Sequence, residues 1–337
     1  MKLATAAALL RSGQAGVLLS LQRLLKPYYR VCFLGAAAGS GLLRRLAGDP
    51  VSLDRLATDF ADAPGERDGL EAWLDLGVSL GELRRSPAGY ALCGRLARAL
   101  AEPAHDPAAA LIEEAATLHQ RWVTEAPRRL RERRLLSVDD FRADLIARSS
   151  RTLEAFVGDA VEAVVPAGGA VRLFEIGCGS AIHIQSAAAR NPELTALGID
   201  LAPDVVALAR ENVRAWGLAD RVRIEQGDVL QRPPGGDFDF ATLHNNVYYF
   251  PVEERAPLLA HVRSFLRPRG CLLLTTACQG GGPTTQILNL WAALTAGCGR
   301  LPGHEELTTQ LEGAGFTAVR AWRLIPMESF YAFQATA

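Results

Sequence analysis

Residues 171–182 read VRLFEIGCGSAI, and this stretch decides the fold that we expect for the chain. Its first half is a short β-prone run, typical of a buried parallel strand. Gly177 and Gly179 interrupt the run, and a helical pattern follows. Glycine adopts positive φ and lets a ligand approach the backbone, while a helix N-terminus presents unpaired N–H groups. The stretch therefore predicts a strand, a tight glycine turn and a helix.

The glycine turn does not have the spacing of a dinucleotide-binding loop. That loop needs a third glycine where this chain has Ile182. What remains is Glu175 followed by Gly177, Gly179 and Ala181. This pattern resembles the first motif of class I S-adenosylmethionine (SAM) dependent methyltransferases. SAM has no pyrophosphate, and an acidic residue on the strand can meet the ammonium of its amino-acid end. The alternative is a turn in any other α/β protein.

Two further acidic residues follow predicted strands at the intervals that this family uses. Asp200 lies 21 residues past Gly179, about where a ribose-binding acid sits in nucleotide-binding α/β folds. Asp228 ends the third predicted strand, and the resemblance implies that it contacts the adenine amine. We also assign Leu201 and Val229, which follow these two acids, to the cofactor site. The sequence thus predicts that acids at three strand ends converge on one SAM molecule.

The C-terminal half alternates strands and helices. This order, together with the resemblance, predicts a Rossmann-like, seven-stranded α/β methyltransferase core whose last strand is antiparallel. Further strands are expected over 197–200, 222–229, 237–244, 316–324 and 330–334, with a turn and a strand over 266–276 and a helix over 203–216. We place this SAM-binding domain at residues 166–337, after the Pro-Ala-Gly-Gly break at 166–169.

The first 165 residues are expected to form a mainly helical domain. Helical patterns cover residues 1–26 up to a break at Pro27, then 53–57 after an N-cap at Ser52, 67–80, 108–136 and 138–164. Residues 81–92 predict two short strands around a turn. Helix, helix and hairpin resemble a winged helix, either of a DNA-binding head or of the dimerisation domain that precedes the core in small-molecule O-methyltransferases. The candidate recognition helix, 66–75, is net acidic, which disfavours DNA.

Composition excludes several classes of function. The chain has 337 residues and a net charge of −1, so no nucleic-acid partner is indicated. Its six cysteines are scattered without a C-x-x-C pair, which predicts neither a metal site nor a disulfide framework and favours the cytoplasm. The apolar run that begins at Leu3 ends at Arg11, so we interpret it as an amphipathic helix rather than a leader. No uncharged stretch is long enough to span a membrane.

The catalytic residues are expected after the fourth strand of the core. The resembling O-methyltransferases place a catalytic histidine there in a His-Asp-Trp turn, but this chain has Tyr248, Tyr249 and Phe250. His244 can act as the base instead, because histidine titrates near neutral pH; it can equally be a structural residue. Tyr248 either positions the acceptor or lines its pocket, and Asn245 or its neighbour Asn246 is expected to contact SAM.

The sequence therefore predicts a cytoplasmic, homodimeric, SAM-dependent methyltransferase that acts on a small, partly apolar acceptor without a membrane or nucleic-acid partner. Methyl transfer is an in-line displacement, for which the protein must hold the acceptor near the methyl group. The apolar helical run over 284–295, preceded by three glycines, is a candidate wall of the acceptor pocket. Two alternatives stay open: a SAM-binding enzyme that does not methylate, and a winged-helix regulator that senses a ligand.

Overall fold

The computed structural model describes residues 10–61, 65–137 and 142–337. The first nine residues of the predicted N-terminal helix and the start of the helix predicted from 138 lie outside the described residues. The chain forms two compact units: Met1–Arg121 with Phe141–Thr152, and Trp122–Asp140 with Leu153–Ala337. The stretch 153–165 belongs to the second unit although we expected it in the N-terminal domain, because its helix packs against the first helix of the core.

The second unit is built on one seven-stranded sheet in the order β5-β4-β3-β6-β7-β9-β8. The strands from β5 to β7 pair in parallel, and β9 runs antiparallel to both of its neighbours. This confirms the predicted core, including its antiparallel last strand. The strands are β3 (Arg172–Ile176), β4 (Thr195–Asp200), β5 (Val222–Gln226), β6 (Phe238–His244), β7 (Leu266–Ala277), β8 (Thr317–Arg323) and β9 (Phe330–Thr336).

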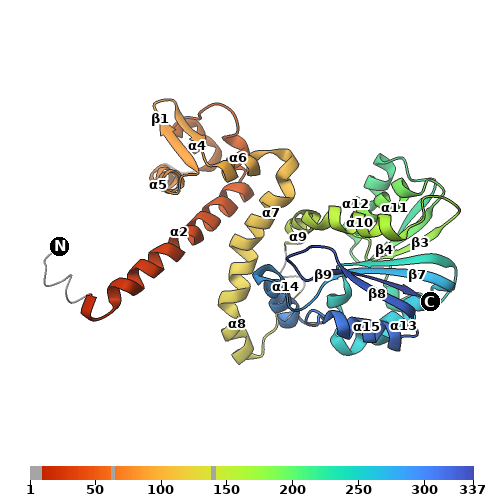
Figure 1. Ribbon diagram of the computed structural model, residues 1–337. Helices are drawn as coiled ribbons and strands as arrows, with labels where there is room; N and C mark the ends of the chain where they lie inside the picture. The colour runs from red at the N-terminus through yellow and green to blue at the C-terminus, as the bar shows by residue number, and fades with distance from the viewer. Residues whose placement is uncertain (1–9, 62–64, 138–141) are drawn as a thin grey trace. The chain divides into compact units, whose positions relative to one another are not determined.

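Helices cover both faces of this sheet, with α10, α11 and α12 on one side and α13 and α15 on the other (Figure 1). The central strands are apolar because both faces are covered, and Phe174, Leu243 and Leu274 are fully buried among them. The helices of this unit are α8 (Gln120–Glu132), α10 (Glu154–Val164), α11 (Ile182–Arg190), α12 (Pro203–Ala215), α13 (Arg255–Arg263), α14 (Pro283–Leu294) and α15 (His304–Gly313).

The turn that we predicted within 266–276 is part of β7, which runs from Leu266 to Ala277. Phe238 of β6 pairs with Leu266, but Phe240 already pairs with Cys271. The residues between Leu266 and Cys271 therefore form a bulge, in which Arg269 adopts a φ of 68°. A turn-like sequence was accommodated inside the strand because β6 continues beside it on both sides of the bulge.

The first unit combines helices with one small hairpin. Ser52 caps α4 as predicted, because its hydroxyl accepts a hydrogen bond from the N–H of Arg55. β1 and β2 pair antiparallel around a tight turn, which confirms the predicted hairpin. The elements are α2 (Gln14–Gly39), α3 (Leu42–Arg45), α4 (Leu53–Phe60), α5 (Glu66–Ser79), β1 (Leu83–Ser86), β2 (Gly89–Leu92), α6 (Arg95–Ala101), α7 (Asp106–Glu114) and α9 (Ala143–Ser150).

The predicted break at Pro27 was wrong, because α2 runs through this residue to Gly39. Proline removes one hydrogen bond inside a helix and crowds the carbonyl four residues earlier. The helix tolerates this where the freed carbonyl can reach water, and Leu24 beside it is 69% exposed. Beyond the proline, Phe33 and Leu34 are buried. Tertiary packing of that half therefore outweighs the local cost.

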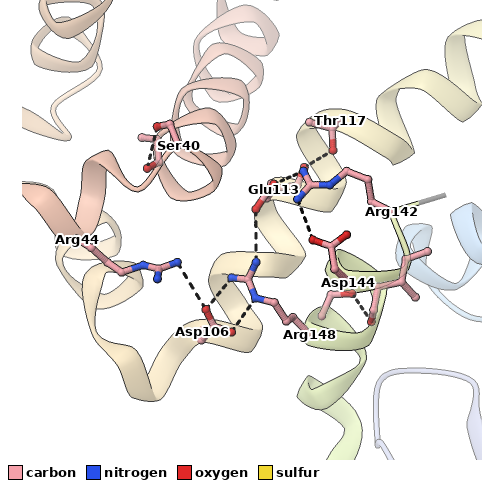
Figure 2. A network of polar contacts seen from close by, with 11 residues as sticks. Ser40, Arg44, Asp106, Glu113, Thr117, Arg142, Asp144 and Arg148 are labelled. Atoms are coloured by element: carbon pink, nitrogen blue, oxygen red, sulfur yellow. Dashed lines mark hydrogen bonds and ion pairs between the residues drawn. The ribbon is translucent and has the colours of Figure 1, made fainter. Parts of the chain in front are cut away.

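A charge network ties α9 to α7 within the first unit (Figure 2). The nearly buried carboxylate of Glu113 pairs with Arg142 and lies 3.9 Å from Arg148. Arg148 also forms two hydrogen bonds to Asp106, of 2.9 and 2.6 Å. Gly39 packs so closely that a Cβ there would lie 2.6 Å from Cδ of Glu113. The network explains why α9, which follows a stretch of the second unit, belongs to the first.

Two long predicted helices are each divided. The run predicted over 108–136 consists of α7, a π-helical turn at Ala115–His119 and α8. The run predicted up to 164 consists, where it is described, of α9, a 3₁₀ turn at Arg151–Leu153 and α10. The spacing of apolar residues does not predict such irregular turns, because the apolar pattern continues across them.

Candidate functional site

The glycine loop between β3 and α11 contains three residues with positive φ. These are Gly177 at 67°, Gly179 at 53° and Ala181 at 65°. Asn246 donates a 2.5 Å hydrogen bond from Nδ2 to the carbonyl of Ile176, directly before the loop. A Cβ on Gly177 would lie 2.7 Å from this Nδ2 atom. Gly177 is thus required both by its backbone conformation and by the close approach of Asn246.

Asp200 ends β4 and holds the same loop from the other side. Its Oδ2 accepts a 3.0 Å hydrogen bond from the N–H of Gly179, and its Oδ1 accepts one of 3.1 Å from Ala202. The backbone carbonyl of Asp200 accepts from Gly227, beyond the end of β5. The acid that we predicted from its spacing is therefore in direct contact with the predicted glycine loop.

Glu175 is a buried acid on the central strand β3. It is 1% exposed, and neither carboxyl oxygen has a hydrogen-bond partner in the described chain. Burial, reinforced by the charge of Asp200, raises the pKa of Glu175 well above its ordinary value. Leaving a buried acid unpartnered is costly. A bound cation would supply the missing partner.

The remaining predicted cofactor residues also follow strand ends. Asp228 lies after β5, where its Oδ1 accepts from the N–H of Leu230 at 2.9 Å. The side chain of Val229 packs in the core of the sheet domain, and Leu201 is 67% exposed. Asn245 follows β6 with a φ of 55° and donates its N–H to the carbonyl of Thr275 at 2.7 Å.

His244 is the last residue of β6 and is only 7% exposed. Its Nδ1 lies 2.9 Å from Oγ1 of the buried Thr275 on β7, whereas its Nε2 is buried without a partner in the described chain. The ring of His183, from α11, packs edge-to-face on His244 with the ring centroids 4.6 Å apart. Burial lowers the pKa of His183 to about 4, and burial together with the charge of His183 lowers the pKa of His244 well below its ordinary value. Both imidazoles are neutral at pH 7.

Aromatic rings gather just beyond His244. Tyr248 is buried and stacks on Tyr249, with the ring centroids 5.2 Å apart. Both rings pack edge-on against Trp291 of α14, which also contacts Trp122 of α8. These contacts place the helix that we predicted as a pocket wall beside the residues after β6.

Two polar residues of this region were not singled out from the sequence. His183 is the second residue of α11, and the helical pattern gave it no distinction. Thr275 meets His244 because β6 and β7 pair in parallel with these two residues opposite each other. Polar residues at corresponding ends of two adjacent parallel strands were the available signal. No sequence signal indicated the contact between His183 of α11 and His244, because that contact depends on how the helix packs on the sheet.

The described residues contain no group of three or more histidine, cysteine, aspartate or glutamate side chains placed to hold a metal ion. Within the same residues, no helix combines the length and the apolar character that a membrane span requires.

Comparison with known proteins places residues 173–270 in a family described as a methyltransferase domain. A demethylspheroidene O-methyltransferase of Rhodobacter capsulatus is 28% identical over 180 residues, which cover 52% of this chain and 43% of that protein. The chain thus spans less than half the length of this curated relative.

Two solved structures resemble nearly the whole chain. Mitomycin 7-O-methyltransferase has a TM-score of 0.80 at 19% identity, covering 97% of this chain and 100% of that one. An N,N-8-amino-8-demethyl-D-riboflavin dimethyltransferase of Streptomyces davawensis has a TM-score of 0.70 at 20% identity, covering 96% and 99%. At these identities the likeness concerns the fold.

Proposed function

The chain has the class I SAM-dependent methyltransferase fold, with a methyltransferase domain over residues 173–270, and from this premise we propose that it transfers the methyl group of SAM to a small-molecule acceptor. The observation that carries the proposal is the buried, unpartnered carboxyl group of Glu175 beside the glycine loop. A site with this geometry favours a cation, and SAM carries both an ammonium and a sulfonium.

Each of the three acids at the strand ends contacts a different part of the cofactor. Glu175 meets the ammonium, Asp200 accepts from the ribose hydroxyls, and Asp228 faces the adenine amine. The hydrogen bond from Gly179 to Asp200 and the bond from Gly227 to the Asp200 carbonyl support one continuous site. Such bonds bring the carboxyl ends of β3, β4 and β5 together, which is where ligands bind in open α/β sheets.

Methyl transfer then proceeds by in-line displacement. The acceptor atom attacks the methyl carbon, the carbon–sulfur bond breaks, and its electron pair stays on sulfur, giving S-adenosylhomocysteine (SAH). In the tautomer that donates from Nδ1 to Thr275, His244 keeps a free lone pair on Nε2 that can take the acceptor's proton. Because this histidine is neutral at pH 7, it needs no prior deprotonation. The enzyme otherwise contributes proximity and orientation.

The aromatic cluster of Tyr248, Tyr249 and Trp291 favours an apolar or aromatic acceptor, such as an intermediate of natural-product synthesis. We assign Tyr248 to the wall of the pocket. The two similar folds described above act, by their names, on an oxygen and on a nitrogen. The fold therefore does not determine which atom of the acceptor is methylated.

Asp200→Ala and His244→Ala are expected to separate binding from turnover. Loss of the ribose contacts should weaken SAM binding by about 100-fold, the effect of removing two hydrogen bonds to a charged group. His244→Ala should leave SAM affinity within about 3-fold and lower the rate of SAH release by at least about 100-fold.

Calorimetry with SAM measures the affinities, and SAH release in the presence of a panel of small phenols and amines measures turnover. Failure of the wild-type protein to bind SAM would refute the proposed function. Unchanged affinity in Asp200→Ala would show that the ribose lies elsewhere.

We also propose that the chain is a homodimer formed through α2 and the winged-helix-like elements of the first unit. The helix exposes many large apolar side chains, which a monomer seldom does over one contiguous surface. Those at least 40% exposed are Leu18, Leu19, Leu21, Leu24, Leu25, Tyr28 and Tyr29, besides Val17 near the start of the helix.

The double variant Leu21→Glu/Leu25→Glu is expected to convert the dimer into a monomer. These residues lie four apart and therefore share one side of α2, so the change places two charges in the proposed interface. Leu208→Glu on α12, where the leucine is 46% exposed, is the matched control and should leave the dimer intact. Light scattering during gel filtration gives the mass; a monomeric wild-type protein would contradict the proposal.

A further inference from the structure

His183 carries a buried ring nitrogen for which the described chain offers no partner. It is the second residue of α11, and its Nδ1 atom is inaccessible to solvent and forms no hydrogen bond. The ring is held in place by its edge-to-face contact with His244, with a centroid distance of 4.6 Å and an interplanar angle of 62°. A buried polar atom on a fixed ring is costly unless a ligand supplies its partner.

The helix that carries His183 begins without a side-chain cap. Ala181 occupies the N-cap position, and no side chain accepts from the first turn of α11. The N–H groups of this turn therefore point out of the helix N-terminus, which favours an anion. The carboxyl group of Glu175, six residues before this N-cap, is the second feature of the site. It is fully buried and has no partner in the described chain.

These groups lie on one face of the sheet. Glu175 of β3 pairs with Thr242 of β6, so their side chains project from the same face. His244 lies two residues beyond Thr242 on that face, and it touches His183. An acid that requires a cation thus stands beside a set of N–H donors that favours an anion. An α-amino acid carries an ammonium and a carboxylate on one carbon, and this arrangement is complementary to both.

We infer that His183 binds the carboxylate of the amino-acid end of SAM, donating from Nδ1 alongside the first N–H groups of α11. The inference rests on the proposed function, because it assumes that SAM occupies this site with its ammonium at Glu175. The ring of His244 packs edge-to-face on that of His183, and its own Nε2 stays available to the acceptor. The same neutral ring, a donor that needs no proton uptake, serves SAM and SAH equally.

The experiment compares SAH with its decarboxylated analogue, which keeps the ammonium, the adenosine and the sulfur but lacks the carboxylate. Calorimetry gives the affinity of the intact wild-type protein for both ligands. His183→Ala is expected to weaken SAH binding by about 10- to 100-fold, the range for a hydrogen bond to a charged group, and to leave the affinity for the decarboxylated analogue unchanged.

Two further substitutions distinguish the donor from the ring. His183→Asn places an amide N–H near the position of Nδ1 and should preserve most of the preference for SAH. His183→Phe keeps an aromatic ring against His244 without a donor and should behave like His183→Ala. His304→Ala, which removes a half-exposed histidine stacked on Tyr331 of the same unit, should change neither affinity.

The inference is overturned if the Phe variant keeps the preference and the Asn variant loses it, since the ring alone would then matter. It is also overturned if His183→Ala weakens both ligands equally, because the effect would then not concern the carboxylate. A wild-type protein that binds neither ligand refutes the proposed function itself, whereas normal SAH binding with an unchanged preference in every variant refutes only the role of His183.

Discussion

Glu175→Gln is expected to stabilise the ligand-free protein while weakening SAM binding by about 100-fold, the order for removing one partner of a buried charge pair. The carboxyl group is fully buried without a partner, and its pKa is raised well above the ordinary value by burial and by Asp200. The folded protein therefore favours the protonated, neutral form of this group more than the unfolded chain does. Glutamine is nearly isosteric with that acid and avoids the cost of protonation.

The pH dependence of the stabilisation follows from linkage. A raised folded pKa means that the folded state binds the proton more tightly, so the stability of the wild-type protein falls as the pH rises from the unfolded pKa toward the folded one. Each pH unit in this window costs about 1.4 kcal/mol. We expect Glu175→Gln to be more stable than the wild-type protein at pH 7, with a gain that shrinks to almost nothing below the ordinary pKa of glutamate, of about 4.3.

Denaturant unfolding at several pH values measures the gain, and calorimetry in buffers of different ionisation enthalpy measures the proton released when SAM binds. Wild-type protein should release a proton from Glu175 on binding, and the variant should not. Glu211→Gln, a change at an exposed position of α12, is the matched control. A variant that is less stable than wild type at pH 8, yet binds SAM normally, would contradict the assignment of Glu175.

Gly177→Ala is expected to damage both the fold and the cofactor site. A side chain at a φ of 67° costs about 1 kcal/mol. The added Cβ would also lie 2.7 Å from Nδ2 of Asn246, which cannot swing away without breaking its bond to the carbonyl of Ile176. The two effects together should destabilise the protein by about 3 kcal/mol and weaken SAM binding by at least about 10-fold, because the loop must shift.

Gly217→Ala separates the two effects. Gly217 has nearly the same φ, 68°, but a Cβ there would meet no atom within 4 Å. Its substitution should therefore lower the free energy of unfolding only by the backbone strain of a side chain at positive φ, about 1 kcal/mol, and should leave SAM affinity unchanged. Equal losses in the two variants, measured by denaturant unfolding and calorimetry with SAM, would show that the approach of Asn246 to the loop does not matter.

Local pattern was sufficient for the sheet domain because its strands are buried on both faces. A buried parallel strand must be apolar along its whole length, so β3, β4 and β6 stand out as short apolar runs, and glycine or acidic residues mark their ends. Pattern failed where packing overrides a local signal. Pro27 ends a helix in most sequences, yet α2 continues through it because the half that follows is anchored in a core.

For the candidate site, too, the sequence indicated some features and only the structure showed the others. The resemblance to the methyltransferase family, together with the interval from Gly179 to Asp200, made Glu175, Asp200 and Asp228 the candidate acids, and the carboxyl ends of parallel strands meet at one edge of the sheet. Spacing could not indicate that Glu175 has no partner, or that Asp200 holds the glycine loop. These facts depend on the distances between side chains from different strands, which the register of the sheet sets.

The amino-acid sequence by itself determined the strands of the parallel core, the hairpin of the first unit and the glycine loop, because each depends on periodicity or on turn residues that are local in the chain; the antiparallel last strand followed from the resemblance to the methyltransferase family. Only the tertiary structure brought His183 of α11 onto His244 of β6, and Thr275 beside it. These residues are 61 and 31 positions from His244, and their contact depends on how α11 packs on the sheet and on the register of β6 with β7.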